Sequence, residues 1–467
     1  MFTFYFEENS RVSRYEQLYR HVKKLIMDDI LTSRSKLPSR RKLADHLRIS
    51  VTTVDQAYQQ LIAEGYVISL PKRGFFVADI LKLPVSQINK CIRETIQHPE
   101  KKAYRFDFCT NVIDPDQFPY LRWAKLEKET ILNEIKDRIN DQDPLGYYPL
   151  RAEIAKYLSR YRGIDATPEQ ILIGTGSETM ITVLRGLFGD IATVALENPG
   201  VSRMKKMYDA FGIATVPVAL DANGLSLNNI RDQKVTILHV TPSHQFPTGI
   251  VMPISRRMEL LEWSGQLPGR FLVEDDYDSE FRFSGNPIPA MASLDREEKV
   301  IYMNSFTKSI APSLRINFLV LPYSLLSQYL EVFRGHHCPV SLIAQVSLYQ
   351  FMKQGWFESH LNRMKQRYRE KRDVLIQRLK SSPLGDKVHI ENEDSGLHFL
   401  VRLSTLFSEE DIVEMAMKKG IRVYSISEYS LEPLAKRPAT LVIGYSGLNP
   451  VMDAAQALFA LLVEVCS

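Results

Sequence analysis

The fold of this 467-residue chain is decided by the stretch Val300-Ile301-Tyr302-Met303-Asn304-Ser305-Phe306-Thr307-Lys308. Its first four residues form an apolar run of strand length, and polar side chains follow directly. Further β-rich runs precede and follow it in the sequence, separated by longer helical segments: Gln170–Ile173, Thr193–Leu196, Thr236–Val240, Phe271–Glu274 and Phe318–Leu321. This alternation predicts an α/β fold with a mostly parallel sheet and helices on both faces.

Polar clusters follow several of these predicted strands, and ligands of parallel sheets bind beyond the carboxyl ends of strands. The clusters are Gly174–Glu178, Thr241–Gly249, Glu274–Tyr277 and Asn304–Lys308, the last followed by Arg315. Singly, they are also compatible with a tight turn, a solvated or metal-binding acidic loop and a solvated lysine. Together they offer a phosphate cradle, a carboxylate, a phenol, an amine and a guanidinium. Pyridoxal 5'-phosphate bound as a lysine Schiff base needs this set.

The order and spacing of these clusters resemble fold-type I aminotransferases over residues 105–467. The resemblance implies a smaller C-terminal α/β part and a role for each residue. Lys308 would form the Schiff base, Asp275 would pair with the pyridinium nitrogen, and Tyr277 would bond the ring 3-hydroxyl. Tyr147 would approach the cofactor of the other subunit. The phosphate would be bound by Ser177, the backbone of Gly176 and Glu178, Ser305 and Arg315.

The basic excess of the chain lies near its N-terminus. Residues 1–80 carry 13 Lys+Arg against 9 Asp+Glu, whereas the other residues carry 46 of each, so the net charge of +4 comes from the first part. Such an asymmetry indicates a small basic module for nucleic acid joined to a neutral body.

Other features narrow the class of protein. No stretch approaches the ~18–20 apolar residues of a membrane span, and the first ten residues lack the basic head and apolar run of a signal peptide. We therefore expect a cytoplasmic protein without membrane contact. The four cysteines, Cys91, Cys109, Cys338 and Cys466, are scattered without C-x-x-C or zinc-finger spacing. They predict reduced thiols and no metal site.

The basic N-terminal region has the pattern of three helices and a hairpin. Apolar periodicity predicts a first helix, and Ser39 and Ser50 can cap a second and a third. The predicted elements are helices over Tyr15–Ile30, Arg40–Leu47 and Val51–Ala63 and β-runs over Tyr66–Leu70 and Phe75–Ala78. A helix-turn-helix with a wing fits this order, and a small helical docking domain is the alternative.

Several side chains of this region suit DNA. Ser50, Thr52 and Thr53 lie in the first turn of the third predicted helix, where hydroxyls and free N–H groups can approach phosphates or base edges. Cations that can displace counterions from DNA are Arg40, Arg41, Lys72 and Arg73. The two sets favour a double-stranded DNA partner.

Residues 11–78 resemble the winged helix-turn-helix domain of GntR-type bacterial regulators, especially in Lys36–Ala44, Ile49–Val54 and Glu64–Tyr66. The resemblance implies that Arg41 holds the DNA backbone, that residues 50–53 enter the major groove, and that Lys72-Arg73-Gly74 reaches the minor groove. Val51 and Asp55 stand where several GntR proteins have arginines that read guanine. The base preference is therefore not transferred.

The two resemblances together define a domain order: residues 11–79 as the DNA-binding head, 80–104 as a linker and 105–467 as the effector domain. This order is similar to the MocR branch of GntR regulators. The similarity implies a head-to-tail homodimer in which pyridoxal phosphate, or its adduct with an amino compound, changes how the heads bind DNA. An aminotransferase with an appended DNA-binding head is the alternative.

Departures from aminotransferases favour a sensor with at most residual transaminase activity. Phe246 precedes Pro247 where aminotransferases have an asparagine, Leu441–Tyr445 lacks their late arginine, and Val201 stands where a stacking aromatic is expected. Val201 and the missing late arginine favour pyridoxal phosphate itself as the signal. Arg203 matches a carboxylate-binding arginine of a GABA-responsive relative, which favours an ω-amino acid instead. Both effectors stay open.

Overall fold

The computed structural model comprises two compact units, Met1–Lys101 and Lys102–Ser467. The predicted linker lies almost wholly outside the described residues, as does Cys91. The structure describes residues 4, 6–7, 12–79, 103–110, 112–141, 143–230, 234–284, 288–381, 384–394, 396–433 and 437–466. Within these ranges, no helix combines the length and the apolar character that crossing a bilayer requires. The three cysteines within these ranges form no disulfide bond.

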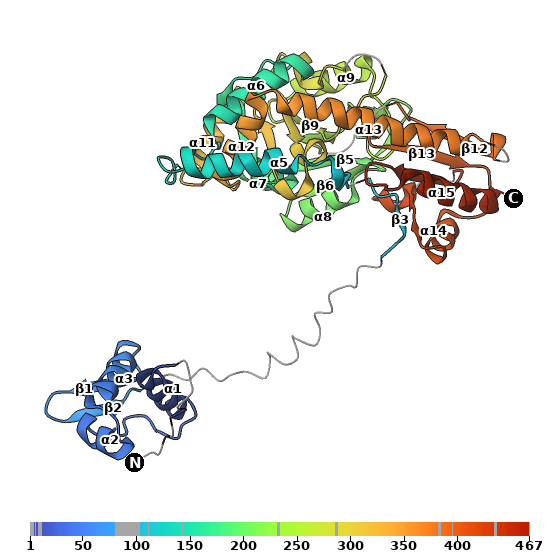
Figure 1. The fold of residues 1–467 in the computed structure, drawn as a ribbon. Coiled ribbons are helices and arrows are strands. Elements are labelled where there is room, and N and C mark those ends of the chain that lie inside the picture. Colours follow the sequence, from blue (N-terminus) through green and yellow to red (C-terminus); the bar gives the residue numbers. More distant parts are fainter. Residues whose placement is uncertain are drawn as a thin grey trace. The chain divides into compact units, whose positions relative to one another are not determined.

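Among its described residues, the first unit has three helices and a hairpin (Figure 1). They are α1 (Arg14–Met27), α2 (Arg40–Leu47), α3 (Val51–Ala63), β1 (Val67–Leu70) and β2 (Gly74–Val77). The bounds of α2 and α3 are the predicted ones. The first helix ends at Met27 rather than Ile30, because Asp29 takes a left-handed φ of 59° and Ile30 is left 65% exposed. Its buried stripe is Leu18, Val22 and Ile26.

Both predicted serine caps of this unit are confirmed. The Ser39 hydroxyl accepts a hydrogen bond from the Lys42 amide at 3.3 Å, and the Ser50 hydroxyl accepts one from the Thr53 amide at 3.1 Å. Each bond satisfies an N–H of the first helical turn and stabilises the helix by about 1 kcal/mol. The caps therefore fix where α2 and α3 begin.

The second unit is built on an eight-stranded sheet in the order β4-β11-β10-β9-β8-β5-β6-β7. The strands are β4 (Ile171–Gly174), β5 (Thr193–Asn198), β6 (Ala214–Asp221), β7 (Gly224–Leu225), β8 (Ile237–Val240), β9 (Phe271–Asp276), β10 (Val300–Ser305) and β11 (Asn317–Val320). Strands β10, β9, β8, β5 and β6 are mutually parallel, whereas β11 is antiparallel to both of its neighbours. The prediction of a mostly parallel α/β sheet is confirmed, with β6 and β7 as additions.

Helices cover both faces of this sheet, because alternate residues of each strand enter different cores. Ile173 and Phe318 pack in one core with α6, α12 and α13, and Leu172 and Leu319 pack in another with α7, α8 and α11. The helices of this region are α5 (Tyr120–Glu129), α6 (Tyr148–Arg162), α7 (Ser177–Phe188), α8 (Ser202–Ala210), α9 (Ile254–Gly265), α10 (Phe306–Ser309), α11 (Tyr323–Val332), α12 (Leu342–Lys353) and α13 (Trp356–Leu379).

The C-terminal part has an antiparallel sheet in the order β12-β13-β16-β15. Its elements are β12 (Val388–Glu391), β13 (His398–Leu403), α14 (Glu409–Lys418), β14 (Ile421–Arg422), β15 (Tyr424–Ser425), β16 (Thr440–Gly444) and α15 (Val451–Cys466). The strand β3 (Phe106–Asp107), from the start of the unit, pairs with β14. This pairing ties the segment after residue 105 to the C-terminal part and sets the path of Thr110 toward Lys308.

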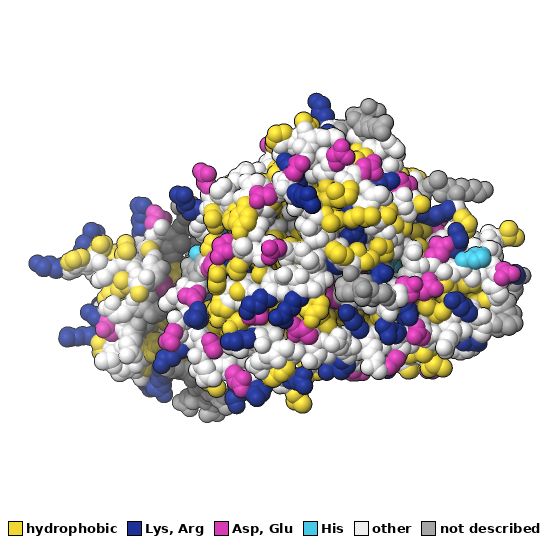
Figure 2. Space-filling view, turned by 90° about the horizontal axis from the view of Figure 1, so that it is seen from above, with side chains coloured by type: hydrophobic (Ala, Val, Ile, Leu, Met, Phe, Trp, Pro, Cys, Tyr) yellow, Lys and Arg dark blue, Asp and Glu magenta, His cyan; other side chains and the backbone are white. Residues whose placement is uncertain are grey.

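Charged side chains of both signs are interspersed on the face of the molecule that Figure 2 shows. This mixture agrees with the equal numbers of basic and acidic residues that follow residue 80.

Candidate cofactor site and DNA-binding surface

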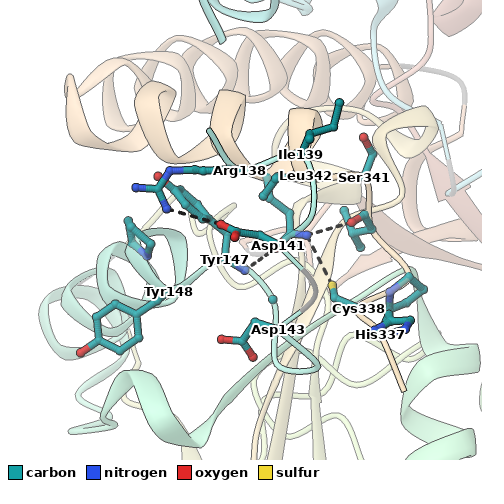
Figure 3. A pocket seen from close by; sticks show the side chains of 15 residues that line it. Arg138, Ile139, Asp141, Asp143, Tyr147, Tyr148, His337, Cys338, Ser341 and Leu342 are labelled. Atoms are coloured by element: carbon teal, nitrogen blue, oxygen red, sulfur yellow. Dashed lines mark hydrogen bonds and ion pairs between the residues drawn. The ribbon is translucent and has the colours of Figure 1, made fainter. Parts of the chain in front are cut away.

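A cavity of about 510 Å³ lies next to Tyr147 (Figure 3). The Tyr147 amide donates to Gln345 Oε1 at 2.7 Å, and the Arg138 guanidinium lies 5.4 Å from the centre of its ring. None of the other residues predicted to bind the cofactor lines this cavity. Tyr147 is therefore separate from the site that the remaining residues form.

That site lies at one edge of the large sheet, where the parallel strands β5, β8, β9 and β10 end. Lys308 follows β10 in the short helix α10 and is 6% exposed. Its Nζ donates to the carbonyl oxygen of Thr110. Burial lowers the pKa of the Lys308 amine to about 8, although Asp278 and Cys109 oppose the shift. Lys308 therefore offers more free amine near neutral pH than an exposed lysine does.

The acidic turn at the end of β9 divides its carboxylates between the two faces of the sheet. Glu274 accepts hydrogen bonds from the Met291 and Ala292 amides at 2.9 and 2.7 Å, and burial raises its pKa to about 7. Asp276 forms an ion pair with Arg162 at 2.7 Å. Because Glu274 and Asp276 are 0% and 1% exposed, the alternative of a solvated acidic loop is wrong.

Asp275 points to the opposite face, as strand alternation requires. Its Oδ2 lies 3.5 Å from His239 Nε2, and the Tyr208 hydroxyl lies 3.1 Å from His239 Nδ1. Burial raises the pKa of Tyr208 well above its usual range, so the phenol keeps its hydrogen. Asp275 lines a small cavity with Val201 and Phe246. It is the carboxylate of the turn that a ligand at the strand ends can reach.

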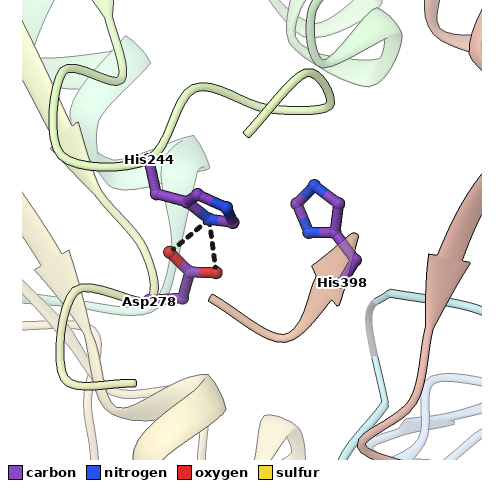
Figure 4. A group of neighbouring side chains, drawn as sticks. All are labelled: His244, Asp278 and His398. Atoms are coloured by element: carbon purple, nitrogen blue, oxygen red, sulfur yellow. Dashed lines mark hydrogen bonds and ion pairs between the residues drawn. The ribbon is translucent and has the colours of Figure 1, made fainter. Parts of the chain in front are cut away.

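Tyr277 follows Asp276 and lies against His244. The two side chains meet at 3.0 Å between the phenol oxygen and Nδ1, and burial raises the pKa of Tyr277 well above its usual range. Figure 4 shows His244 beside Asp278 and His398. Among the described residues, these three side chains offer metal-ligating atoms within 4.8 Å of one another. This grouping was not predicted, because the sequence was judged for metal sites by the spacing of its cysteines.

Three of the predicted phosphate residues, Gly176, Glu178 and Arg315, lie together at the start of α7. A Cβ atom on Gly176 would lie 3.0 Å from the Arg315 guanidinium and 2.6 Å from Glu178 Oε2, so the absence of a side chain leaves the cradle open. The Gly176 amide already donates to Asn317 Oδ1 at 2.9 Å. Ser177 begins α7, and the Ser305 hydroxyl accepts from the Thr307 amide as the cap of α10. The open cradle at a helix start suits an anion.

Glu178 joins two arginines that the sequence assigns to different ligands. Its carboxylate contacts Arg315 at 3.1 Å and Arg203 at 3.0 Å. Burial opposes but does not outweigh the backbone and arginine contacts, so the pKa of Glu178 is lowered. The predicted phosphate arginine and the predicted effector arginine are therefore linked through one side chain.

In the smaller unit, the predicted DNA-binding residues are mostly exposed. Arg40 forms an ion pair with Asp55 and lies 5.4 Å from the centre of the Phe75 ring. The Ser50 hydroxyl bonds those of Thr52 and Thr53 at 2.8 and 2.7 Å. The other members of this set are Arg41, Lys72 and Arg73, all exposed, and Gly74, which takes a φ of 105° in the hairpin turn. The Arg40 pair reduces the charge that Arg40 brings to DNA.

Sequence reasoning missed the residues that support the site from a distance. Thr110 and Arg162 carry no local signal, because they reach Lys308 and Asp276 only after the chain folds. His239 stands in an apolar strand, where a polar residue at an alternate position could have been noticed. His244 lies within the Thr241–Gly249 cluster, but no separate role was predicted for it.

Family models match both units. The model for bacterial regulatory proteins of the gntR family matches residues 14–77, and the model for aminotransferase class I and II matches residues 105–450. The chain is 36% identical to an uncharacterized HTH-type transcriptional regulator, YdeL, of Bacillus subtilis over 93% of each chain.

Two further similarities agree. The chain is 30% identical to the probable rhizopine catabolism regulatory protein MocR of Rhizobium meliloti, over 95% of this chain and 92% of the relative. The crystal structure of an alpha-aminoadipate aminotransferase from Thermus thermophilus, complexed with N-(5'-phosphopyridoxyl)-L-leucine, is similar with a TM-score of 0.66 and 24% identity. The similarity covers 77% of this chain and 92% of the Thermus thermophilus chain, and it shows that the two proteins share a fold. The chain belongs to the MocR-type branch of the GntR family of transcriptional regulators, which joins a helix-turn-helix unit to an aminotransferase class I and II unit.

Proposed function

We propose that this regulator binds pyridoxal phosphate through residues 105–467 and double-stranded DNA through residues 11–79, with residues 80–104 as the linker. Occupancy of the cofactor site, by pyridoxal phosphate or by its adduct with an amino compound, changes DNA binding. The observation that carries the proposal is the buried Lys308 with its lowered pKa, at the same sheet edge as Asp275 and Tyr277.

The residues at this edge fit the cofactor. Lys308 would supply the amine, Asp275 would hold the ring nitrogen, and Tyr277 would bond the ring 3-oxygen. The phosphate would lie over Gly176, near Ser177, the Glu178 backbone, Ser305 and Arg315, where a Cβ atom on residue 176 would close the space. Pyridoxal phosphate, when bound, supplies an electrophilic carbon and an electron-withdrawing ring.

The DNA contacts follow from the exposure of the smaller unit. We propose that Arg41 binds a phosphate, that Ser50, Thr52 and Thr53 enter the major groove, and that Lys72-Arg73-Gly74 reaches the minor groove. The Arg40–Asp55 pair makes Arg40 the weakest phosphate contact of the set, because part of its charge is already compensated.

The proposed signal is pyridoxal phosphate itself. The Arg203–Glu178 contact supports this choice, since a carboxylate effector would have to displace a resident carboxylate at 3.0 Å. An ω-amino acid held by Arg203 is the competing signal. Absorbance titration of the loaded protein with candidate amines separates them, because a saturable shift with one amine would reject the cofactor as the sole signal.

Two observations support a homodimer. Large apolar side chains are exposed on the larger unit: Leu121 is 89% exposed and Ile139 is 73% exposed. The cavity beside Tyr147 is open to a partner side chain or ligand. We therefore propose a head-to-tail homodimer in which Tyr147 contacts the cofactor of the other subunit, as a cytoplasmic protein.

An aminotransferase is the second candidate, favoured by the low pKa of Lys308, which also suits proton transfer. A footprint upstream of the gene, with and without pyridoxal phosphate, and a transamination assay across amino donors distinguish the two. We expect a cofactor-dependent footprint and little turnover. Turnover at about 1 s⁻¹ or faster without a footprint would reject the regulator proposal.

A further inference from the structure

His244 and Asp278 form a buried histidine–aspartate pair (Figure 4). The pair contacts Tyr277 and has no part in the proposed function. His244 Nδ1 lies 3.2 and 3.1 Å from the two carboxylate oxygens of Asp278 and 3.0 Å from the Tyr277 hydroxyl. His244 and Asp278 are each 2% exposed. One ring nitrogen is thus shared between a carboxylate and a phenol.

The shared contact determines where the hydrogens lie. An ionised carboxylate only accepts hydrogen bonds, so His244 Nδ1 carries a hydrogen. Tyr277 can then only accept from that nitrogen, and its own hydroxyl hydrogen is left for another acceptor. Burial keeps the Tyr277 pKa well above its usual range, so this hydrogen stays on the phenol.

The pair is held by close packing. A Cβ atom on Gly396 would lie 1.9 Å from His244 Cε1 and 2.6 Å from Asp278 Oδ2, so only glycine fits there. The His398 ring lies 4.9 Å from the His244 ring, and His398 Nε2 donates to the Pro247 carbonyl at 3.0 Å. His244 therefore has little freedom to turn away from Tyr277.

We propose that His244, oriented by Asp278, is a positioning residue that fixes the Tyr277 oxygen so that the phenol donates its hydrogen to the 3-oxygen of pyridoxal phosphate. This inference rests on the proposed function of Tyr277. Phe246, whose ring meets the Tyr277 ring edge-on at 6.0 Å, offers no donor on that side.

The acidic groups near Tyr277 are Asp275, Asp276 and Asp278 of its own turn and Glu197 of β5. Lys308 and His398 lie near the same pair. Nearby carboxylates disfavour a negative charge on the 3-oxygen of the cofactor. A hydrogen-bond donor to that oxygen therefore matters more here than it would in a positively charged site.

The test uses the full chain loaded with pyridoxal phosphate and a matched pair of variants. His244→Asn keeps an N–H group near the position of Nδ1, whereas His244→Gln places its amide near the position of Nε2. The readouts are the apparent pKa of the cofactor absorbance band and the dissociation constant of pyridoxal phosphate.

We expect His244→Gln to raise that apparent pKa by about 0.5 or more, because the ring oxygen loses a donor that stabilises its negative charge. Binding should weaken roughly threefold to tenfold. His244→Asn should stay near the wild type. In a Tyr277→Phe background, His244→Gln should cause no further change, since it acts through the phenol.

An unchanged titration of His244→Gln, or the same shift in the Tyr277→Phe background, would overturn the inference. If thermal melting shows that His244→Gln does not fold, Asp278→Asn replaces it, and an unshifted titration of that variant also overturns the inference. Absence of a cofactor band in the wild type would instead reject the proposed function.

Discussion

The two units hold their functional residues in opposite ways. In the smaller unit, the residues assigned to DNA are mostly exposed and lie within two short stretches, 40–53 and 72–74. In the larger unit, the residues assigned to the cofactor come from several strand ends; Lys308 is buried, Asp275 and Tyr277 are partly buried, and Arg315 is exposed. Substitutions in the smaller unit should therefore act on binding alone, whereas those in the larger unit should also act on stability.

The largest effect is expected at Lys308. Lys308→Ala should abolish the cofactor absorbance of the Schiff base completely, because Lys308 is the buried lysine that directly follows β10. The fold and binding to non-specific DNA should persist. Absorbance spectra after incubation with pyridoxal phosphate check this, with the exposed Lys125→Ala as the control. An unchanged spectrum would place the Schiff base on another lysine.

Arg162 tests how far the buried site depends on charge pairing. Arg162 and Asp276 are 4% and 1% exposed in their side chains, so Arg162→Ala leaves an unpaired buried carboxylate. We expect the larger unit to lose about 3–5 kcal/mol of unfolding free energy. Denaturant unfolding measures it, and Arg160→Ala, an exposed position on the same helix, should change it by less than about 0.5 kcal/mol. Equal effects of the two variants would contradict the dependence of the larger unit on this buried ion pair.

The same contrast explains what could be predicted from the sequence. The bounds of α2 and α3 were predicted because Ser39 and Ser50 are local signals that act within one helical turn. The strand-end position of Lys308 was equally local. Its contact with Thr110 was not predicted, because that contact depends on β3 pairing with β14, far along the chain. The roles of His239 and Arg162 escaped for the same reason, since both act through tertiary contacts.

The pH dependence of cofactor loading tests whether Lys308 behaves as a buried lysine. Burial lowers the pKa of Lys308 to about 8, so the free amine increases with pH below that value and is nearly complete above it. The loading rate of the unliganded protein should rise about tenfold per pH unit from pH 6 to pH 7 and level off above about pH 8. Stopped-flow absorbance measures the rate. A rise that continues toward pH 10 would show that Lys308 behaves as an exposed lysine.

The smallest effect is expected at the exposed surface of the smaller unit. Arg41 is exposed, and its proposed phosphate contact carries no sequence information. Arg41→Ala should weaken binding to all DNA sequences severalfold and reduce the slope of log K against log salt by about 1. Titrations at several salt concentrations measure both, and Arg20→Ala, whose guanidinium pairs with Glu16 on α1, serves as the control. A change in base preference with an unchanged salt slope would move Arg41 from the phosphate backbone to a base edge, and exposure alone would then no longer separate positioning residues from reading residues.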